Sequence, residues 1–374
     1  MDGLHPIRLE ASLHETIWGG SRLQSKGWKF LPLEEAALGE SWETDMRAVA
    51  QNEPYAGKTL GRLVEELGPA LLGKQVMAIF GRRFPLLAKF IDANTKLSVQ
   101  VHPDDRYAAE HEHGKLGKTE CWYILEVAPG ASIVHGFKAP TSRAAVQRAI
   151  EEVRLEDLLH EEQVQAGDVI FVPAGTVHAI GSGIFLYELQ EYSDVTYRMY
   201  DYGRLTAAGA PRELHIERAL DVASYHKSLS IKMKPVALAG GPGYEDRCLI
   251  ACRYFVVREL HFNSSEGGDA AGAGKGSSMD GETGRSCIIL SSLGAEVQVR
   301  YGTALEYSES LSGGQTMVLP AALGKYRIQG IGVLLLSYVP APNDEARQLW
   351  EAKQSEGSSS QNSVQIRGSL GQEL

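Results

Sequence analysis

Cysteine and long apolar runs are both scarce in this sequence. Four cysteines in 374 residues are too few for a disulfide scaffold, so the chain is not a disulfide-rich secreted protein. Cys248 and Cys252 stand four residues apart with no second pair nearby, so we interpret them as buried thiols rather than metal ligands. The longest apolar run, around residues 331–339, is far short of the ~20 residues that a membrane helix needs. We therefore expect no membrane partner.

Positive charge is also in short supply. The chain has 37 Lys and Arg against 47 Asp and Glu, which gives a net charge of −10. No basic cluster interrupts this acidic background, and an acidic surface repels phosphate backbones, so we expect no nucleic-acid partner. Residues 1–15 carry charges where a signal peptide needs an apolar stretch, so we expect a cytoplasmic protein.

Helical periodicity is limited to a few short segments. Leucine and valine recur at helical spacing over residues 60–71, and a second helix is expected after Thr141, a plausible N-cap, with residues 155–159 extending it or starting another. A glycine-rich strand-to-helix turn is missing, which argues against a nucleotide-binding fold. Short strands are expected elsewhere, at residues 97–101, 121–127, 169–172, 184–189, 254–260, 288–291, 297–301 and 333–339. This pattern predicts a mostly β chain, built as an antiparallel barrel or sandwich.

Three composition changes suggest a domain organisation. Residues 239–243 (AGGPG) separate two strand-rich halves, so we predict a first domain over 1–238 and a second over 239–345. The segment 267–284 has seven glycines in eighteen residues and reads as a loop. Residues 346–374, with the polar stretch QSEGSSSQNS, are expected to form a flexible tail.

An internal repeat supports two related halves. Gly167–His178 and Gly314–Lys325 share the same Gly-to-Pro spacing and the same apolar strand. Aligned without gaps, His178 falls on Lys325, so the second half would lack a metal ligand at this position. Chance similarity of two strand-turn units is the alternative explanation.

A set of potential metal ligands surrounds the first copy of this repeat. The stretch ending at His178 resembles the second motif of the cupin barrels, Gly-x5-Pro-x-Gly-x2-His. Gln100 and His102 stand two apart on an expected strand and share one face, and Glu120 opens another strand. Two imidazoles, a carboxylate and an amide oxygen suit a divalent metal, above all a catalytic zinc with an open position; satisfied structural histidines are the alternative. His111 and His113 lie in a polar segment without strand pattern and are expected in a solvated loop.

Together these features resemble the type I mannose-6-phosphate isomerase family in its shorter bacterial form. The similarity covers roughly residues 6–340, and the separated motifs occur in the family's order. The motifs that carry it are Ile17-Trp-Gly-Gly20, Gly39-Glu-Ser-Trp-Glu43, Gln100-Val-His-Pro-Asp-Asp105, Gly117-Lys-Thr-Glu-Cys-Trp-Tyr123, Tyr187-Glu188 and Asp194-Val-Thr-Tyr-Arg198.

The resemblance implies two cupin barrels with a small helical insertion and one zinc ion per chain. It implies that the metal ligands are Gln100, His102, Glu120 and His178. It also implies that Arg198, Lys118 and Glu188 are catalytic, and that Arg204 stands where relatives carry a phosphate-binding lysine. Where better-known relatives have a tyrosine two residues after the last histidine ligand, this chain has Ile180.

The implied reaction interconverts mannose 6-phosphate and fructose 6-phosphate through a cis-enediol. It needs a base near the carbon acid and positive charge where the enediolate forms. Glu188, a zinc-bound water or another carboxylate could be the base. The sugar phosphate needs a local basic pocket, expected from Lys118, Arg198 and Arg204, with Ser98 as a possible hydroxyl donor.

Two other function classes stay open at this point. An iron or manganese cupin oxidoreductase would usually have three histidines and a glutamate, whereas Gln100 replaces one histidine here. A non-catalytic sugar-phosphate-binding cupin would not need the complete ligand set. The sequence says little about oligomeric state.

Overall fold

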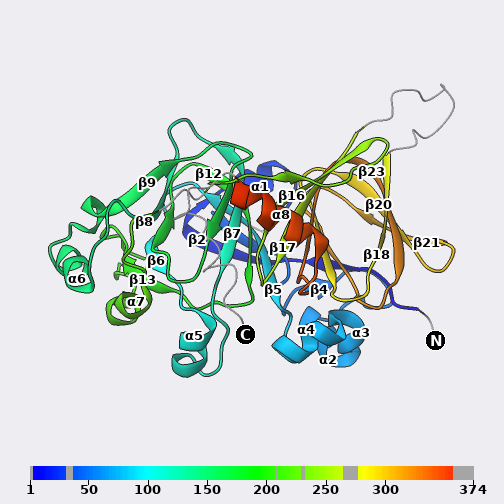
Figure 1. Ribbon diagram of the computed structural model, residues 1–374, viewed down its shortest axis with the longest axis horizontal. Coiled ribbons are helices and arrows are strands. Elements are labelled where there is room, and N and C mark those ends of the chain that lie inside the picture. Colours follow the sequence, from blue (N-terminus) through cyan, green and yellow to red (C-terminus); the bar gives the residue numbers. More distant parts are fainter. Residues whose placement is uncertain (1–2, 31–36, 207–208, 229–231, 264–276, 357–374) are drawn as a thin grey trace.

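Three antiparallel sheets form the framework of the computed structural model, which describes residues 3–30, 37–206, 209–228, 232–263 and 277–356. Figure 1 shows them side by side along the long axis, with the strands of the second half at one end. The prediction of a mostly β chain is confirmed, and each strand expected from the sequence overlaps an observed one. No helix in the described part of the chain is both long enough and apolar enough to span a membrane.

The first half supplies a seven-stranded and a five-stranded sheet. The seven-stranded sheet contains, in spatial order, β14 (Lys232–Met233), β10 (Val169–Val172), β7 (Glu120–Val127), β12 (Ile184–Glu191), β5 (Leu86–Ala93), β2 (Ser12–Gly20) and β3 (Leu38–Trp42). The five-stranded sheet contains β13 (Tyr197–Tyr200), β6 (Val99–Val101), β11 (His178–Ile180), β8 (Ser132–Phe137) and β9 (Leu159–Gln163).

The strands of the second half form an eleven-stranded sheet together with three short strands from before residue 239. Its main path is β15 (Val236–Ala237), β16 (Tyr244–Ala251), β17 (Val256–Phe262), β23 (Lys325–Tyr338), β19 (Ile288–Ser292), β22 (Thr316–Leu319), β1 (Ile7–Glu10) and β4 (Val49–Ala50). The remaining strands, paired off this path, are β18 (Ser277–Glu282), β20 (Glu296–Tyr301) and β21 (Tyr307–Leu311).

Side-chain alternation in β12 explains how the sheets are stacked. Every residue of this strand is buried, because both faces of the seven-stranded sheet are covered. Ile184 and Leu186 join an apolar cluster that includes residues of the five-stranded sheet. Phe185 and Tyr187 point the opposite way, into a cluster shared with the eleven-stranded sheet. Glu188 has the parity of Leu186 and therefore faces the five-stranded sheet.

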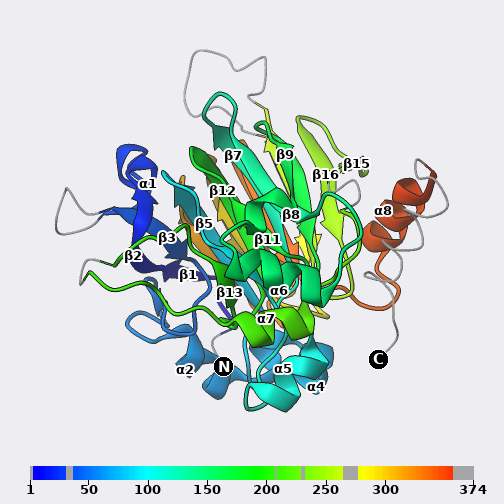
Figure 2. The same cartoon turned by 90° about the vertical axis from the view of Figure 1, so that its left-hand side faces the viewer.

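Helices cover the outer face of the five-stranded sheet and one edge of the second half. Figure 2 shows α6 (Arg143–Glu151) and α7 (Ile216–Val222) in front of the strands β8, β11 and β13. Ser142 caps α6 by accepting from Ala145 N at 3.3 Å, one residue after the expected Thr141. The other helices are α1 (Arg22–Ser25), α2 (Leu60–Leu67), α3 (Pro69–Leu72), α4 (Lys74–Phe80), α5 (Asp105–His111), α8 (Glu345–Glu356) and a 3-10 turn (Leu155–Asp157).

The helical pattern over residues 60–71 is divided between α2 and α3. Gly68 ends α2 with a positive φ of 49°, and Pro69 starts α3, where a missing N–H is harmless. Leu60, Leu63 and Val64 are buried, so the predicted apolar face is confirmed.

Two of the predicted segments differ from the structure. The flexible tail over 346–374 is wrong for residues 346–356, because they belong to α8, whose Trp350 is fully buried and donates to Leu249 O at 3.2 Å. The loop over 267–284 is wrong for residues 277–282, which form β18. Residues 264–276 and 357–374 lie outside the described residues.

The predicted division at residue 239 remains a prediction, although the strands show how the two halves are joined. β1 pairs with β22, with Ile7 opposite Val318, so an N-terminal strand belongs to the sheet of the second half. In the internal repeat, β10 and β22 are the two equivalent strands, and Lys325 begins β23 with an exposed side chain.

Candidate active site

A row of polar side chains crosses the five-stranded sheet. In the strand register, Gln100 on β6 lies directly opposite both His178 on β11 and Arg198 on β13. Directly opposed residues of antiparallel strands point to the same face, so these three side chains share one surface of the sheet. Gln100 is thus a neighbour of His178, which lies 78 positions later in the sequence, and of Arg198, which lies 98 positions later.

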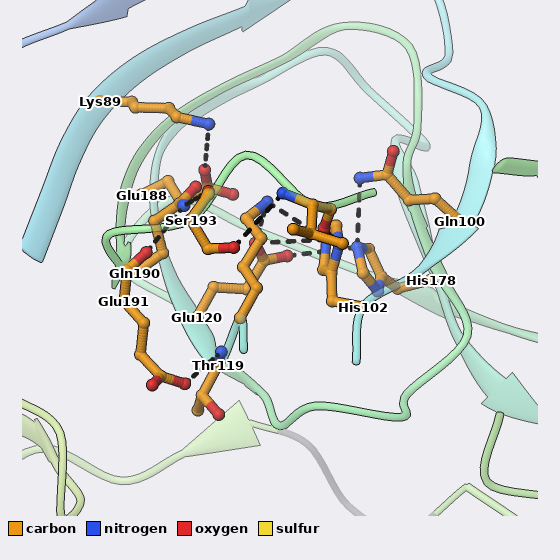
Figure 3. Close-up of polar contacts among 12 residues, drawn as sticks. Lys89, Gln100, His102, Thr119, Glu120, His178, Glu188, Gln190, Glu191 and Ser193 are labelled. Atoms are coloured by element: carbon orange, nitrogen blue, oxygen red, sulfur yellow. Dashed lines mark hydrogen bonds and ion pairs between the residues drawn. The ribbon is translucent and has the colours of Figure 1, made fainter. Parts of the chain in front are cut away.

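Glu120 meets this row from the opposite sheet. It is the first residue of β7 and is fully buried, and its Oε1 lies 3.2 Å from His178 Nε2. Its Oε2 lies 3.7 Å from Nε2 of His102, which directly follows β6. The ligand atoms of His102, Glu120 and His178 all lie within 4.8 Å of one another (Figure 3). The predicted gathering of these three residues is confirmed as geometry.

Backbone carbonyls set the orientation of both imidazoles. His102 Nδ1 donates to Val195 O at 2.9 Å, and His178 Nδ1 donates to Thr176 O at 2.8 Å. Each ring then has its lone pair on Nε2, the atom that faces Glu120. Burial lowers the pKa of His178 to about 3 and also lowers that of His102, so both rings are neutral at physiological pH. Neutral imidazoles are the form that binds a metal.

The cluster fits a divalent cation. Both carboxylate oxygens of Glu120 are buried, and Oε1 has no hydrogen-bond donor within the described part of the chain. Burial, followed by the negative charge of Glu188, raises the pKa of Glu120 to about 8. A cation among the three ligands would relieve this cost, and two nitrogens with one oxygen are a common zinc donor set. His102, Glu120 and His178 could therefore hold a metal ion.

Gln100 lies beside this cluster. Its carboxamide nitrogen is 3.3 Å from His178 Nε2. Rotation of the carboxamide by half a turn would place its oxygen there instead, and an oxygen can be a fourth ligand.

Lys118 points into the same cluster. Its side chain is buried, and Nζ lies 2.8 Å from Glu120 Oε2 and 3.2 Å from His102 Nε2. The expectation that Lys118 would join Arg198 and Arg204 in one basic pocket is not met by these contacts, which direct its ammonium group to the ligand residues instead.

Glu188 is held as an ionised carboxylate. Its Oε1 lies 3.1 Å from Lys89 Nζ (Figure 3), and its Oε2 accepts from Trp122 Nε1 at 3.0 Å. Burial alone would raise the pKa of Glu188, but the ammonium groups of Lys89 and Lys118 lower it to about 2. The sequence interpretation missed Lys89, although a lysine inside the buried strand LLAKFIDA is a signal that could have revealed it.

Arginines gather at the other end of the row. Arg198 Nε donates to Ser98 Oγ at 3.3 Å, so these two predicted residues are in contact. Arg204 and Arg212 both donate to the carboxylate of Asp201, from Nε at 3.2 Å and 2.8 Å. Burial, and next the charge of Arg212, lowers the pKa of Arg198. Three guanidinium groups around one carboxylate make this end of the site electropositive.

Asp201 and Arg212 were not found from the sequence. Arg212 lies fourteen residues after Arg198, in APRELH, and no spacing rule connects the two. The turn that brings them together is marked by Tyr202 at a positive φ of 59° and by Gly203 at 68°.

Several other histidines have structural contacts. His215 Nδ1 accepts from Arg198 N at 3.3 Å and so supports the position of β13. His135, opposite His178 in the register, contacts Phe171 O at 3.0 Å and Ser228 Oγ at 3.2 Å. His111 ends α5 and His113 follows it; both are exposed and have no place in the cluster.

Comparison with known proteins agrees with this geometry. The chain is 34% identical to the mannose-6-phosphate isomerase ManA of Bacillus subtilis over 344 residues, which covers 89% of this chain and 99% of that protein. The chain belongs to the type I phosphomannose isomerase family. The family model for the phosphomannose isomerase type I catalytic domain matches residues 7–123.

Two further relatives support membership in this isomerase family. The mannose-6-phosphate isomerase of Streptococcus mutans is 39% identical over 264 residues, covering 70% of this chain and 80% of that protein. The crystal structure of the mannose 6-phosphate isomerase from Bacillus subtilis superposes with a TM-score of 0.78 at 32% identity, covering 89% and 99% of the two chains. Ile180, where the resemblance to the family implies a tyrosine in better-known relatives, is 3% exposed and packs in the apolar cluster between the two sheets of the first half.

Proposed function

We propose that this protein interconverts mannose 6-phosphate and fructose 6-phosphate. The observation that carries the proposal is the buried cluster of His102, Glu120 and His178, with Lys118 directed into it, in a chain of this family. The mostly β fold with its antiparallel sheets supports the proposal, and we infer that these sheets form the two cupin barrels expected for the family.

We propose zinc as the resident ion. His102, Glu120 and His178 would hold it, with Gln100 as the fourth protein ligand after rotation of its carboxamide. When bound, zinc supplies Lewis-acid polarisation of the substrate oxygens.

Arg198, Lys118 and Glu188 would each have a separate role in the proton transfer. The reaction moves a proton between carbon 1 and carbon 2 through a cis-enediol, and negative charge develops on the oxygens. Arg198 shares the face of Gln100 and His178 and would stabilise this charge with its guanidinium group. Lys118 would donate a hydrogen bond to a substrate oxygen at the cluster. Glu188, ionised by its ion pair with Lys89, is the carboxylate available to accept a proton.

The arginines provide the binding site for the phosphate. A dianionic phosphate needs several donors in an overall acidic protein, and Arg198, Arg204 and Arg212 outnumber the single carboxylate of Asp201. Ser98 is buried and would add a hydroxyl donor. Sugar phosphate would thus lie with its phosphate at the arginines and its first two carbons toward Glu120.

A coupled assay for fructose 6-phosphate formation tests the proposal. Purified protein is assayed with mannose 6-phosphate before and after treatment with a chelator, and again after zinc is restored. We expect isomerisation that is lost with the metal and recovered with zinc. Metal-loaded protein that binds the sugar phosphate but forms no product would indicate a non-catalytic role, and oxygen consumption would indicate an oxidoreductase.

A further inference from the structure

The second half of the molecule contains a cavity of its own. It has a volume of about 650 Å³ and lies at the end of the strands β16, β17, β18 and β23. It shares no residue with the metal cluster or with the arginines, since all its lining residues come after residue 238. The size is within the range of ligand pockets for small molecules.

An ion pair forms part of the wall of this cavity. On β17, Arg258 has the same parity as Leu260 and Phe262, which belong to the apolar core of the second half. Arg258 Nε lies 3.1 Å from Asp246 Oδ1, and the Asp246 side chain is only 3% exposed. Both residues line the cavity. The Arg258 side chain is 22% exposed, so part of its guanidinium group remains accessible from the cavity.

Tyr326 gives an independent indication of a ligand. Its side chain is 4% exposed and lines the cavity, yet its hydroxyl makes no hydrogen bond to any residue that the structure describes. The hydroxyl oxygen is not one of the fully buried side-chain atoms that lack a partner, so it is accessible from the cavity. Gly281 on β18 allows the Tyr326 ring to pack closely against it, because a Cβ at this position would lie 2.4 Å from that hydroxyl. Arg258, Asp246 and Tyr326 together offer donors and acceptors within one cavity.

The charges of the lining exclude a sugar phosphate. Four acidic side chains face only two basic ones, Arg258 and Arg285, and Arg258 is already neutralised by Asp246. An anion would be repelled here, in contrast to the arginine-rich end of the catalytic site. A neutral ligand with several hydroxyl groups could bond to the Arg258–Asp246 pair and to the Tyr326 hydroxyl. It could also pack on the flat ring of Tyr244, which stacks on Phe262 at 5.9 Å between ring centroids.

We propose that this cavity, formed around Arg258, Asp246 and Tyr326, is a second binding site for a neutral, polyhydroxylated small molecule such as an unphosphorylated hexose. The site is separate from the isomerase centre. Its occupation requires neither the metal nor the phosphate-binding arginines.

A ligand-detected NMR titration that measures the binding of D-mannose to the full-length protein tests this proposal. We compare wild-type protein with Tyr326→Phe, which removes only the unpaired hydroxyl, and with Arg198→Ala, which alters the catalytic site. Tyr301→Phe is the matched control, because Tyr301 is equally buried in the same half but its hydroxyl bonds to His5 at 2.8 Å, outside the cavity.

We expect mannose to bind wild-type, Arg198→Ala and Tyr301→Phe protein alike, and Tyr326→Phe roughly 3- to 10-fold more weakly, as expected for one hydrogen bond. Isomerase activity should be unchanged in Tyr326→Phe. Absence of mannose binding to wild-type protein, or loss of binding in Arg198→Ala but not in Tyr326→Phe, would overturn the proposal. D-mannosamine binding in place of mannose would assign the cavity to cations instead. Because the titration measures binding alone, its result is independent of whether the isomerase activity is found.

Discussion

Lys89 and Glu188 face each other across neighbouring strands β5 and β12, with Lys89 Nζ 3.1 Å from Glu188 Oε1. Glu40 approaches the same ammonium group at 3.5 Å, and the ring of Trp42 lies 4.7 Å from it. Lys89 is buried, so this contact is not a surface ion pair. It keeps Glu188 charged in a place where burial alone would protonate it.

Replacing Lys89 should therefore change the acid side of the pH profile. In Lys89→Met the cation that lowers the pKa of Glu188 is lost and burial dominates, so this pKa rises. The acid limb of kcat should move to higher pH, and the protein should lose about 3–5 kcal/mol of unfolding free energy, as for a broken buried pair. Kinetics from pH 5 to 9 and urea denaturation measure the two effects.

A surface pair provides the control. Lys58 Nζ lies 2.7 Å from Glu66 Oε2 in an exposed pair, and Lys58→Met should change stability by less than about 1 kcal/mol and leave the pH profile intact. An unshifted acid limb in a folded Lys89→Met protein would remove Glu188 from the proton-transfer step.

The stability of the wild-type protein should also depend on Glu188 at low pH. Its folded-state pKa is lowered to about 2, so its ion pair stabilises the protein above the ordinary value near ~4 and loses this effect as the pH falls toward 2. Urea denaturation at pH 6 and pH 3 should show a smaller difference in Lys89→Met than in wild-type protein. An equal difference in both would contradict the ion-pair explanation.

His178→Ala should remove both metal and activity while leaving the chain folded. His178 lies at the centre of the ligand row, and its Nε2 is 3.2 Å from Glu120 Oε1. Mass spectrometry of the purified variant measures bound zinc, and circular dichroism checks the fold. His111→Ala is the control, since His111 is exposed at the end of α5. Full zinc occupancy in His178→Ala would exclude His178 from the ligands.

Arg198→Ala should keep its zinc and lose most of its rate. A guanidinium group has no lone pair for a metal, and removing a donor from developing negative charge costs ~10²–10³-fold in kcat. Arg198→Lys should recover only part, because an ammonium group cannot reproduce the planar fork. A raised KM with unchanged kcat would instead assign Arg198 to ground-state binding, and wild-type kinetics in both variants would reject any role.

Arg212→Ala should weaken phosphate binding. Arg212 shares Asp201 with Arg204 and lies at the electropositive end of the row, so we expect KM for mannose 6-phosphate to rise about ten-fold or more with little change in kcat. Arg143→Ala is a matched control, because Arg143 also pairs with an aspartate, Asp221, but on exposed helices. Equal KM values in the two variants would place the phosphate elsewhere.

We expect the C-terminal helix α8 to be needed for folding, and we expect residues 357–374, which follow it, not to be needed. Trp350→Ala should cost about 3–5 kcal/mol of unfolding free energy, because this fully buried side chain fills a space in the core shared by the two halves. Removing residues 357–374 should leave kcat and KM nearly unchanged. A many-fold loss of rate in that folded truncation would show that these residues reach the active site.

The sequence alone determined much of the local structure and pointed to the candidate ligand residues. Short apolar runs between turn residues predicted the strands, because a strand buried on both faces is apolar throughout and one buried on one face alternates. The spacing of Gln100 and His102, and the turn ending at His178, placed three ligand candidates on or next to strands without knowledge of their neighbours. Such signals are short-range, and they need no information about which strand pairs with which.

Only the tertiary structure decided the partners of these residues. The register that sets Lys89 opposite Glu188, ninety-nine positions later, depends on how β5 and β12 pair, and no local pattern encodes it. The same is true of Arg212 beside Asp201, of β1 in the sheet of the second half, and of Trp350 in the shared core. Packing decides which groups surround a charged or hydroxyl-bearing side chain. Burial and nearby charge then set its pKa, and the surrounding groups decide which of its hydrogen bonds remain unused.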